Sequence, residues 1–161
     1  MKEIYTKRCH LRSWNENDLV DLQEIFCSAK VARLAGFKEK MPDEVLSILQ
    51  MFIQDSKKCL WAVAEKNSDR AIGWFEVHKF PELGERAYEI GYCLKESYWG
   101  KGIMPEVVLS VIKEMKESGK VEKLVCSYFE YNEQSKRVIG KCGFHYYKKE
   151  DNKIFYVYNL K

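Results

Sequence analysis

The sequence has little of what marks several large classes of protein. It holds three prolines in 161 residues, no CxxC pair, and no run of about 18 apolar residues such as a membrane-spanning helix needs. The first residues carry charges but no apolar stretch, so we expect no signal peptide. The 27 Lys and Arg nearly balance the 24 Asp and Glu, and a formal charge of +3 is too small to predict nucleic-acid binding. We therefore expect a cytoplasmic protein with no membrane and no direct nucleic-acid partner.

The six cysteines and three histidines are scattered along the chain. Without an export signal, such cysteines are expected to be reduced core thiols and not a disulfide framework. None of them has the spacing of zinc ligands, so we expect no metal site. The content of 46% hydrophobic and 14% aromatic residues suffices for a real core, and the length fits one domain over residues 1–161.

The spacing of apolar residues predicts a mixture of strands and helices. Residues 4–14 are expected to form a first strand, and Asn15 or Asn17 to cap the helix that follows. A second helix is expected to begin near Pro42, and residues 31–37 to join the two. The remaining elements are predicted as strands at 61–65, 71–79, 87–94 and 124–131, helices at 105–118 and 133–142, and a terminal hairpin at 144–160. This order predicts an α/β, or layered α+β, fold in which helices cover a central sheet.

A turn with two glycines, made by Trp99, Gly100, Lys101 and Gly102, joins a predicted strand to a predicted helix. The glycines allow positive φ and let a ligand come close to the backbone. Unpaired amides at the start of the helix and the positive end of its dipole favour an anion, and Lys101 adds charge. The segment lacks GxxxxGK[ST] and the third glycine of GxGxxG. Alone, the turn predicts an anion site, and a nucleotide-binding module is one reading of it.

A second motif lies downstream, where Asn132 and Ser135 open a helix that ends in Lys141, Gly143 and Phe144. Together with the glycine turn, it resembles the GNAT family of acetyl-CoA-dependent N-acetyltransferases. The motifs of that family look like (R/Q)-x-x-G-x-G/A and Asn-x-x-(Ser/Ala) before Lys-x-Gly-Phe. The order and separation of the two motifs agree, as does the order of elements across nearly the whole chain. The resemblance implies a single domain with a mixed, mostly antiparallel central sheet, helices on both faces, and acetyl-CoA as cosubstrate.

The resemblance also implies roles for particular residues. Backbone groups of Cys93 and Leu94, at a splayed strand end, would pair with the pantetheine arm of acetyl-CoA. Asn132 would anchor the cofactor near its thioester. The pyrophosphate would lie on backbone amides of the turn and the helix start, and the residues implied there are Trp99, Gly100, Lys101, Gly102, Ile103 and Met104.

The expected acceptor is a primary amine. The segment 11–18, with the pattern Leu-Arg-Ser-Trp-x-x-x-Asp, and the pairing of Asn132 with Ser135 resemble the branch that acetylates the N-termini of ribosomal proteins. That branch implies a protein N-terminus as acceptor, and a small amine such as an antibiotic or polyamine is the alternative. Residues 31–37 are expected to line the acceptor slot. Arg33 either meets an acidic acceptor there or is an ordinary surface charge. Both a monomer and a homodimer fit the sequence.

The acid that protonates the leaving thiolate is expected to be Ser135. Many relatives use a tyrosine on the last helix, but Ile139 stands at that place and cannot donate a proton. In the ribosomal branch a serine at the position of Ser135 takes that duty. A serine that bonds its own backbone at a helix start is the alternative reading of Ser135. For the whole chain, the alternative is a domain that binds acyl-CoA without turnover.

The base is expected to be Glu89, in the strand just before the glycine turn. A carboxylate that is partly buried there can have a raised pKa and accept the proton of the acceptor ammonium. Alternation places Glu89, Gly91 and Cys93 on one face of the sheet, opposite Tyr92. The weaker candidates are Glu76, His78 and Glu130.

Overall fold

The computed structural model of the protein describes residues 3–56 and 58–161. Its eight-stranded sheet has the order β1-β2-β3-β4-β5-β6-β8-β7. Only β5 and β6 are parallel, and every other neighbouring pair is antiparallel. The strands are β1 Ile4–Tyr5, β2 Cys9–Arg12, β3 Leu60–Glu65, β4 Ala71–Lys79, β5 Ala87–Leu94, β6 Lys123–Phe129, β7 His145–Glu150 and β8 Lys153–Asn159. This confirms the mixed, mostly antiparallel sheet, in which β3, β4 and β5 form an antiparallel meander.

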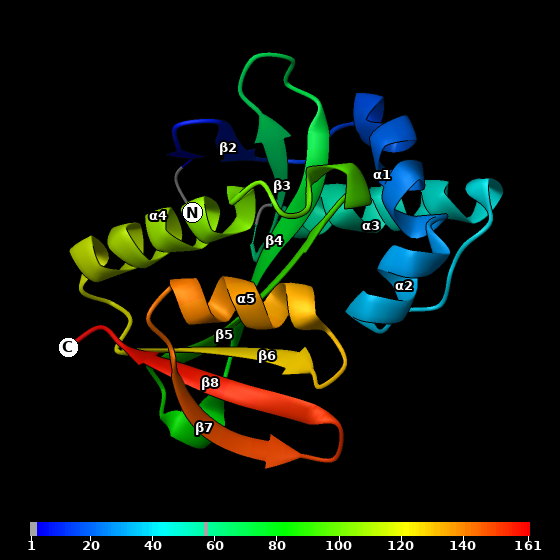
Figure 1. The fold of residues 1–161 in the computed structure, drawn as a ribbon. Helices are drawn as coiled ribbons and strands as arrows, with labels where there is room; N and C mark the ends of the chain where they lie inside the picture. The colour runs from blue at the N-terminus through cyan, green and yellow to red at the C-terminus, as the bar shows by residue number, and fades with distance from the viewer. Residues whose placement is uncertain (1–2, 57) are drawn as a thin grey trace.

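Helices cover both faces of the sheet, as expected (Figure 1). The α-helices are α1 Leu19–Phe26, α2 Ala29–Ala35, α3 Val45–Asp55, α4 Ile103–Ser118 and α5 Glu133–Lys141. One core cluster packs α4 and α5 against the sheet, around Ile90, Val107 and Ile139. The second packs α1, α2 and α3 against the other face, around Phe26, Leu49 and Trp74. Cys93 belongs to the second cluster and Ile90 to the first, so the predicted alternation along β5 is correct.

The N-terminal region departs from the sequence prediction in two places. Residues 4–14 form the hairpin of β1 and β2 and not one strand, because the Thr6 hydroxyl caps the turn: it donates to the carbonyl of Cys9 at 3.0 Å and accepts from its amide at 2.9 Å. The predicted joining segment contains a third helix, α2. Ser28 caps its start through the amide of Val31, and Gly36, with φ of 80°, ends it. Seven residues are too few to give a clear helical period.

The predicted starts of two helices are confirmed. Asn15, and not Asn17, caps the first helical segment by accepting the Asn17 amide. A 3-10 turn at Pro42–Glu44 leads into α3, and Gly119, with φ of 65°, ends α4. Helix α4 begins at Ile103, two residues earlier than predicted.

The sheet opens into a fork between β5 and β6. Their parallel pairing begins at Ala87 with Lys123 and stops at Ile90 with Cys126, although β5 continues to Leu94. Figure 1 shows the two strands diverging beyond this point, with β6 turning toward β8 and β7. The last four residues of β5 therefore have no strand partner on the β6 side within the described residues. In the described part of the chain, no helix is long and apolar enough to cross a membrane.

Candidate active site

The glycine turn has the backbone conformation that its sequence predicts. Gly100 and Gly102 have φ of 73° and 72°, in the left-handed region where a side chain is strained. The turn runs directly into α4, the longest helix. Among the described residues, no oxygen accepts a hydrogen bond from any of five consecutive backbone amides, those of Gly100, Lys101, Gly102, Ile103 and Met104. Five open donors at a helix N-terminus fit a doubly charged diphosphate group.

Contacts from distant parts of the chain hold this turn in place. Arg8, in the β1–β2 turn, donates to the carbonyl of Lys101 at 2.8 Å and to the carboxylate of Glu106 at 2.8 Å. The indole nitrogen of Trp99 donates to the carbonyl of Leu94 at 2.9 Å. The ammonium of Lys101 lies over the ring of Tyr98, with 5.2 Å to the ring centroid. The carbonyl of Lys101 is therefore engaged by Arg8, while the five amides of residues 100–104 stay open among the described residues.

A buried ion pair anchors the chain between β5 and the turn. The ammonium of Lys95 lies 2.8 Å from the carboxylate of Asp21, and both side chains are over 90% buried. Asp21 also accepts from Arg70 and from the backbone amide of Ala71. Burial opposes its ionisation, but the hydrogen bonds from Arg70 and Lys95 outweigh that effect and lower the pKa of Asp21. This network ties α1 to the entrance of the turn.

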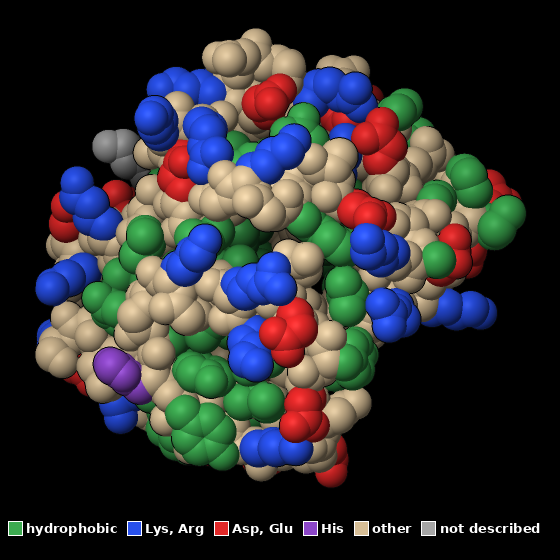
Figure 2. Space-filling model, viewed as in Figure 1, with side chains coloured by type: hydrophobic (Ala, Val, Ile, Leu, Met, Phe, Trp, Pro, Cys, Tyr) green, Lys and Arg blue, Asp and Glu red, His purple; other side chains and the backbone are tan. Residues whose placement is uncertain are grey.

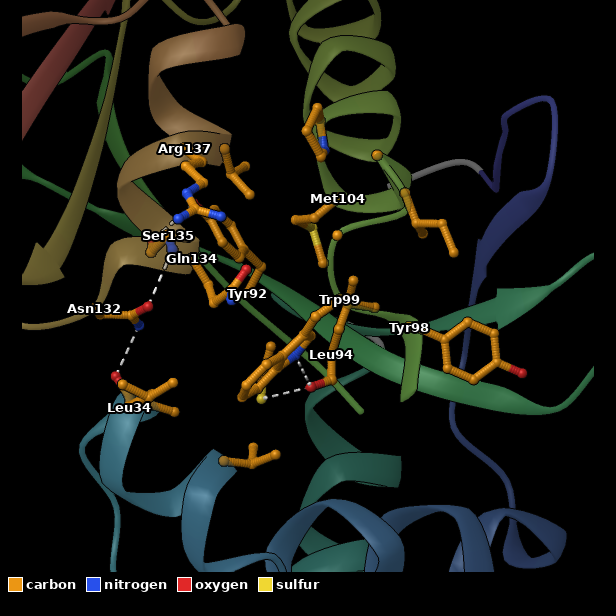
Figure 3. A pocket seen from close by; sticks show the side chains of 18 of the residues that line it. Leu34, Tyr92, Leu94, Tyr98, Trp99, Met104, Asn132, Gln134, Ser135 and Arg137 are labelled. Carbon is orange, nitrogen blue, oxygen red and sulfur yellow. Dashed lines mark hydrogen bonds between the residues drawn. The ribbon is translucent and has the colours of Figure 1, made fainter. Parts of the chain in front are cut away.

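A pocket of about 210 Å³ lies at the fork (Figure 3). Its wall on one side is α2, which contributes Val31, Leu34 and Ala35. Residues 31–37 were predicted to line the acceptor slot; these three line the present pocket, whereas Arg33 is exposed outside its lining. The other lining residues come from β5, from the turn with the start of α4, and from α5: Tyr92, Cys93, Leu94, Tyr98, Trp99, Gly100, Gly102, Ile103, Met104, Pro105, Asn132, Gln134, Ser135, Arg137, Val138 and Lys141.

Asn132 joins two walls of this pocket. Its side-chain oxygen accepts the amide of Ser135 at 3.0 Å and so caps α5. Its side-chain nitrogen donates to the carbonyl of Leu34, at the end of α2, at 2.8 Å. Figure 3 shows both bonds reaching from Asn132 across the pocket edge. Asn132 therefore holds α2 against α5, and both its side-chain oxygen and its side-chain nitrogen are engaged in hydrogen bonds within the protein.

Ser135 projects from the first turn of α5 toward β5. Its hydroxyl lies 2.9 Å from the hydroxyl of Tyr92, and both residues line the pocket. The alternative reading of Ser135 is wrong for the side chain, because the Ser135 hydroxyl bonds Tyr92 and the cap is made by Asn132. Burial raises the pKa of Tyr92 well above its usual range, so the phenol stays protonated near neutral pH. Ile139, at the place of the usual tyrosine, is 2% exposed and packs in the core.

Glu89 lies at the fork but does not line the pocket. It precedes Ile90, the last residue of β5 that pairs with β6, and its carboxylate accepts from the Ser127 hydroxyl at 2.8 Å. Its cross-strand partner on β4 is His78, whose ring lies 3.0 Å from Glu76. These side chains share the sheet face of α1, α2 and α3, whereas Tyr92 and Ser135 lie on the face of α5.

Basic side chains surround the opening. Arg137 and Lys141 lie one turn apart on α5 and both line the pocket. Figure 2 shows a hollow with hydrophobic side chains at its floor and Lys and Arg side chains at its rim. No group of three or more His, Cys, Asp or Glu within residues 3–56 and 58–161 could hold a metal ion.

Most of the site residues predicted from sequence meet in this pocket. The exceptions are Lys101, whose side chain turns to Tyr98, and Glu89 on the other face. Other residues of the site were not predicted from the sequence: Tyr92, Arg137, Arg8 and the hydrogen bond from the Asn132 side chain to the carbonyl of Leu34. Alternation along β5 was a usable signal for Tyr92, because it places that residue opposite Glu89 at the same strand end. The contact from Arg8 spans more than 90 residues and left no signal in the sequence.

Comparison with known proteins gives a consistent result. Residues 8–145 match the family described as "Acetyltransferase (GNAT) domain". A ribosomal-protein-serine acetyltransferase of Escherichia coli (strain K12) is 33% identical over 76 residues, which are 47% of this chain and 42% of that protein. The chain thus spans less than half of this curated relative.

Solved structures resemble the whole chain in fold. A GNAT-family acetyltransferase from Bacillus anthracis has a TM-score of 0.85 at 19% identity, with 98% of each chain covered. An acetyl transferase from Salmonella typhimurium, described as modifying the N-terminal serine of ribosomal protein L7/L12, has a TM-score of 0.77 at 17% identity and covers 99% of this chain and 100% of its own. The family match covers most of the sequence, and with the open turn and the forked sheet it establishes that this chain belongs to the GNAT family of acetyltransferases.

Proposed function

We propose that this protein transfers an acetyl group from acetyl-CoA to the primary amine at a protein N-terminus by direct attack. The observation that carries the proposal is the row of five open amides at residues 100–104, which borders the pocket that contains Ser135. Acetyl-CoA supplies an activated thioester: its carbonyl carbon accepts the amine, and its sulfur leaves as a thiolate.

The phosphates fit the turn and its surroundings. The open amides and the dipole of α4 stabilise the pyrophosphate. Arg137 and Lys141 add two positive charges at the pocket, which suit the remaining phosphate of CoA. The unpaired edge of β5 at Cys93 and Leu94 offers backbone groups to the pantetheine arm, in the manner of an added strand. Asn132 would reach the cofactor only through a rearrangement of its present bonds, so its support of the site is first of all structural.

The fork supports direct transfer, because it connects the two sheet faces. An amine that approaches from the face of α1, α2 and α3 passes Glu89, which lies at the fork on that face. Glu89 takes the proton of the ammonium, directly or through water. On the opposite face, Ser135 donates a proton to the leaving thiolate, and the second proton that the attacking nitrogen loses as the amide forms returns to the serine oxygen through water. Base and acid thus act from two sides of one opening, with the reacting carbon between them.

The acceptor class rests on the relatives. Two of them, in Escherichia coli and Salmonella typhimurium, are described as acting on ribosomal-protein serines. The segment 11–18, which carries the resemblance to that branch, is structurally important here. Arg12 forms a buried ion pair with Asp18 at 2.8 Å and orders the start of α1. Segment 11–18 therefore stabilises the sheet face covered by α1, α2 and α3, from which the acceptor approaches, and none of its residues lines the pocket.

An acceptor panel tests the proposal. Peptides with free N-terminal serine or alanine are compared with the same peptides carrying a blocked N-terminus, and with polyamines and aminoglycosides, while CoA release and product mass are followed. We expect product only from peptides with a free α-amine. Turnover of small amines alone would overturn the acceptor class. Tight CoA binding without transfer to any amine would instead favour a domain that senses acyl-CoA.

A further inference from the structure

The hydroxyls of Tyr92 and Ser135 form a hydrogen-bonded pair at the pocket wall. They come from β5 and α5, 43 residues apart, and meet at 2.9 Å. The backbone amide of Ser135 is fixed by Asn132, so the start of α5 has little freedom to move the serine away. In Figure 3, Tyr92 and Ser135 lie next to each other between the turn and α5.

The direction of the hydrogen bond decides what Ser135 can do. Each hydroxyl has one hydrogen to give. A serine that donated to Tyr92 would turn its hydrogen away from the pocket and would be useless as an acid. A phenol hydroxyl is intrinsically a stronger hydrogen-bond donor than an aliphatic hydroxyl, which favours donation from Tyr92 to Ser135. Negative charge that develops on a thiolate in the pocket favours the same direction, because the serine hydrogen then points at the charge.

We propose that Tyr92 is a positioning residue that donates to the Ser135 hydroxyl and so directs the serine proton toward the leaving sulfur. This inference rests on the proposed function and adds to it a residue that acts through Ser135. It explains how an ordinary serine serves where relatives place a tyrosine. Ile139 is 2% exposed in the core, so the phenol of this site comes from the strand and not from the helix.

The surroundings of Tyr92 keep the phenol in its neutral, donating form. Burial raises the pKa of Tyr92, and the nearby thiols of Cys126 and Cys142 act on it as well. Burial also raises the pKa of both thiols, which keeps them neutral. Among the described residues, no carboxylate or imidazole accepts a hydrogen bond from the phenol. Its other hydrogen-bonding neighbour is the thiol of Cys126, whose sulfur is a weaker acceptor than the oxygen of Ser135.

The test is a double-mutant cycle of Tyr92→Phe and Ser135→Ala, with Tyr156→Phe as the control. Tyr156 is a partly buried tyrosine of the same cluster that does not line the pocket. CoA release is followed with saturating acetyl-CoA and a peptide acceptor, and CoA affinity and thermal stability are measured for each variant. We expect Tyr92→Phe to lower kcat about tenfold, the order expected for one lost hydrogen bond, with KM for acetyl-CoA unchanged. Ser135→Ala should lower kcat by about 100-fold, as for loss of a general acid.

The coupling between the two substitutions is decisive. On the Ser135→Ala background, Tyr92→Phe should change kcat by less than about twofold, because the group it positions is gone. Independent, multiplying effects would overturn the proposal, since Tyr92 would then act on the substrate itself. An unchanged kcat in Tyr92→Phe would overturn it too.

Failure of the proposed function is separable from failure of this inference. Hydrolysis of bound acetyl-CoA by water needs no amine acceptor, and departure of the thiolate would need the same acid there. The cycle is therefore also measured on hydrolysis without acceptor. On the Ser135→Ala background, Tyr92→Phe should again leave the rate of hydrolysis nearly unchanged. Independent, multiplying effects of the two substitutions on hydrolysis would contradict the role of Tyr92.

Discussion

Asn132 offers a substitution series whose outcome follows from two separate hydrogen bonds. Loss of an N-cap costs about 1 kcal/mol of stability, and loss of one neutral hydrogen bond, here to the carbonyl of Leu34, costs about another 1 kcal/mol. Asn132→Ala removes both bonds, so we expect a loss of about 2 kcal/mol. Asn132→Ser keeps a capping oxygen but is too short to reach Leu34, so it should lose about 1 kcal/mol.

Urea unfolding, followed by circular dichroism, measures these differences. For a domain of this length, 1 kcal/mol corresponds to roughly 2–4 °C in Tm, so Asn132→Ala should melt about 4–8 °C below wild type and Asn132→Ser about half as far below. Equal stability of the two variants would refute the claim that the bond to the Ser135 amide and the bond to the Leu34 carbonyl contribute separately. A loss within about 0.5 kcal/mol for Asn132→Ala would refute both.

Three further substitutions probe the turn, the buried ion pair and the core. Gly100→Ala should cost about 1–2 kcal/mol of backbone strain and weaken CoA binding about 5–30-fold, whereas Gly140→Ala, in ordinary helix with open space around it, should leave calorimetric CoA affinity unchanged. The lowered pKa of Asp21 means that its contribution is present above its unfolded-state pKa and is lost as the pH falls through the lower folded-state pKa. Asp21→Asn should therefore lower the free energy of unfolding by about 3 kcal/mol at pH 7, because the ammonium of Lys95 is left buried without this partner. In a series of unfolding measurements at falling pH, the variant should lose less stability than wild type below about pH 4. Ile139→Tyr should cost about 1–3 kcal/mol by overpacking and should not raise kcat, and a faster enzyme would contradict the placement of the acid on Ser135.

Local patterns predicted most of the fold. The bounds of β4 and β5 agree with the sequence prediction to the residue, because apolar alternation and flanking turn residues mark both ends of each strand. The hairpin of β1 and β2 was missed, since its turn depends on Thr6 bonding Cys9 and not on a glycine or proline. Helix α2 was missed because its seven residues are too few to show a helical period of apolar residues.

The site was predictable where it depends on backbone conformation. Two glycines before a helix were enough to locate the open amides of the turn. Contacts that join distant segments were out of reach: Arg8 to Lys101, Lys95 to Asp21 and Tyr92 to Ser135. The role of Glu89 stays a prediction, because no contact links it to the pocket and its place on the opposite sheet face fits a base only through the fork.

The proposed function depends above all on the five amides of residues 100–104, which are expected to bind the pyrophosphate of CoA. A titration of the ¹⁵N-labelled protein with CoA, followed by amide chemical shifts, measures this directly, with pantetheine as the control ligand that lacks the phosphates. The account predicts large shifts at Gly100, Lys101, Gly102, Ile103 and Met104 with CoA, and none at these amides with pantetheine. Saturable CoA binding that leaves these five amides unshifted would contradict it.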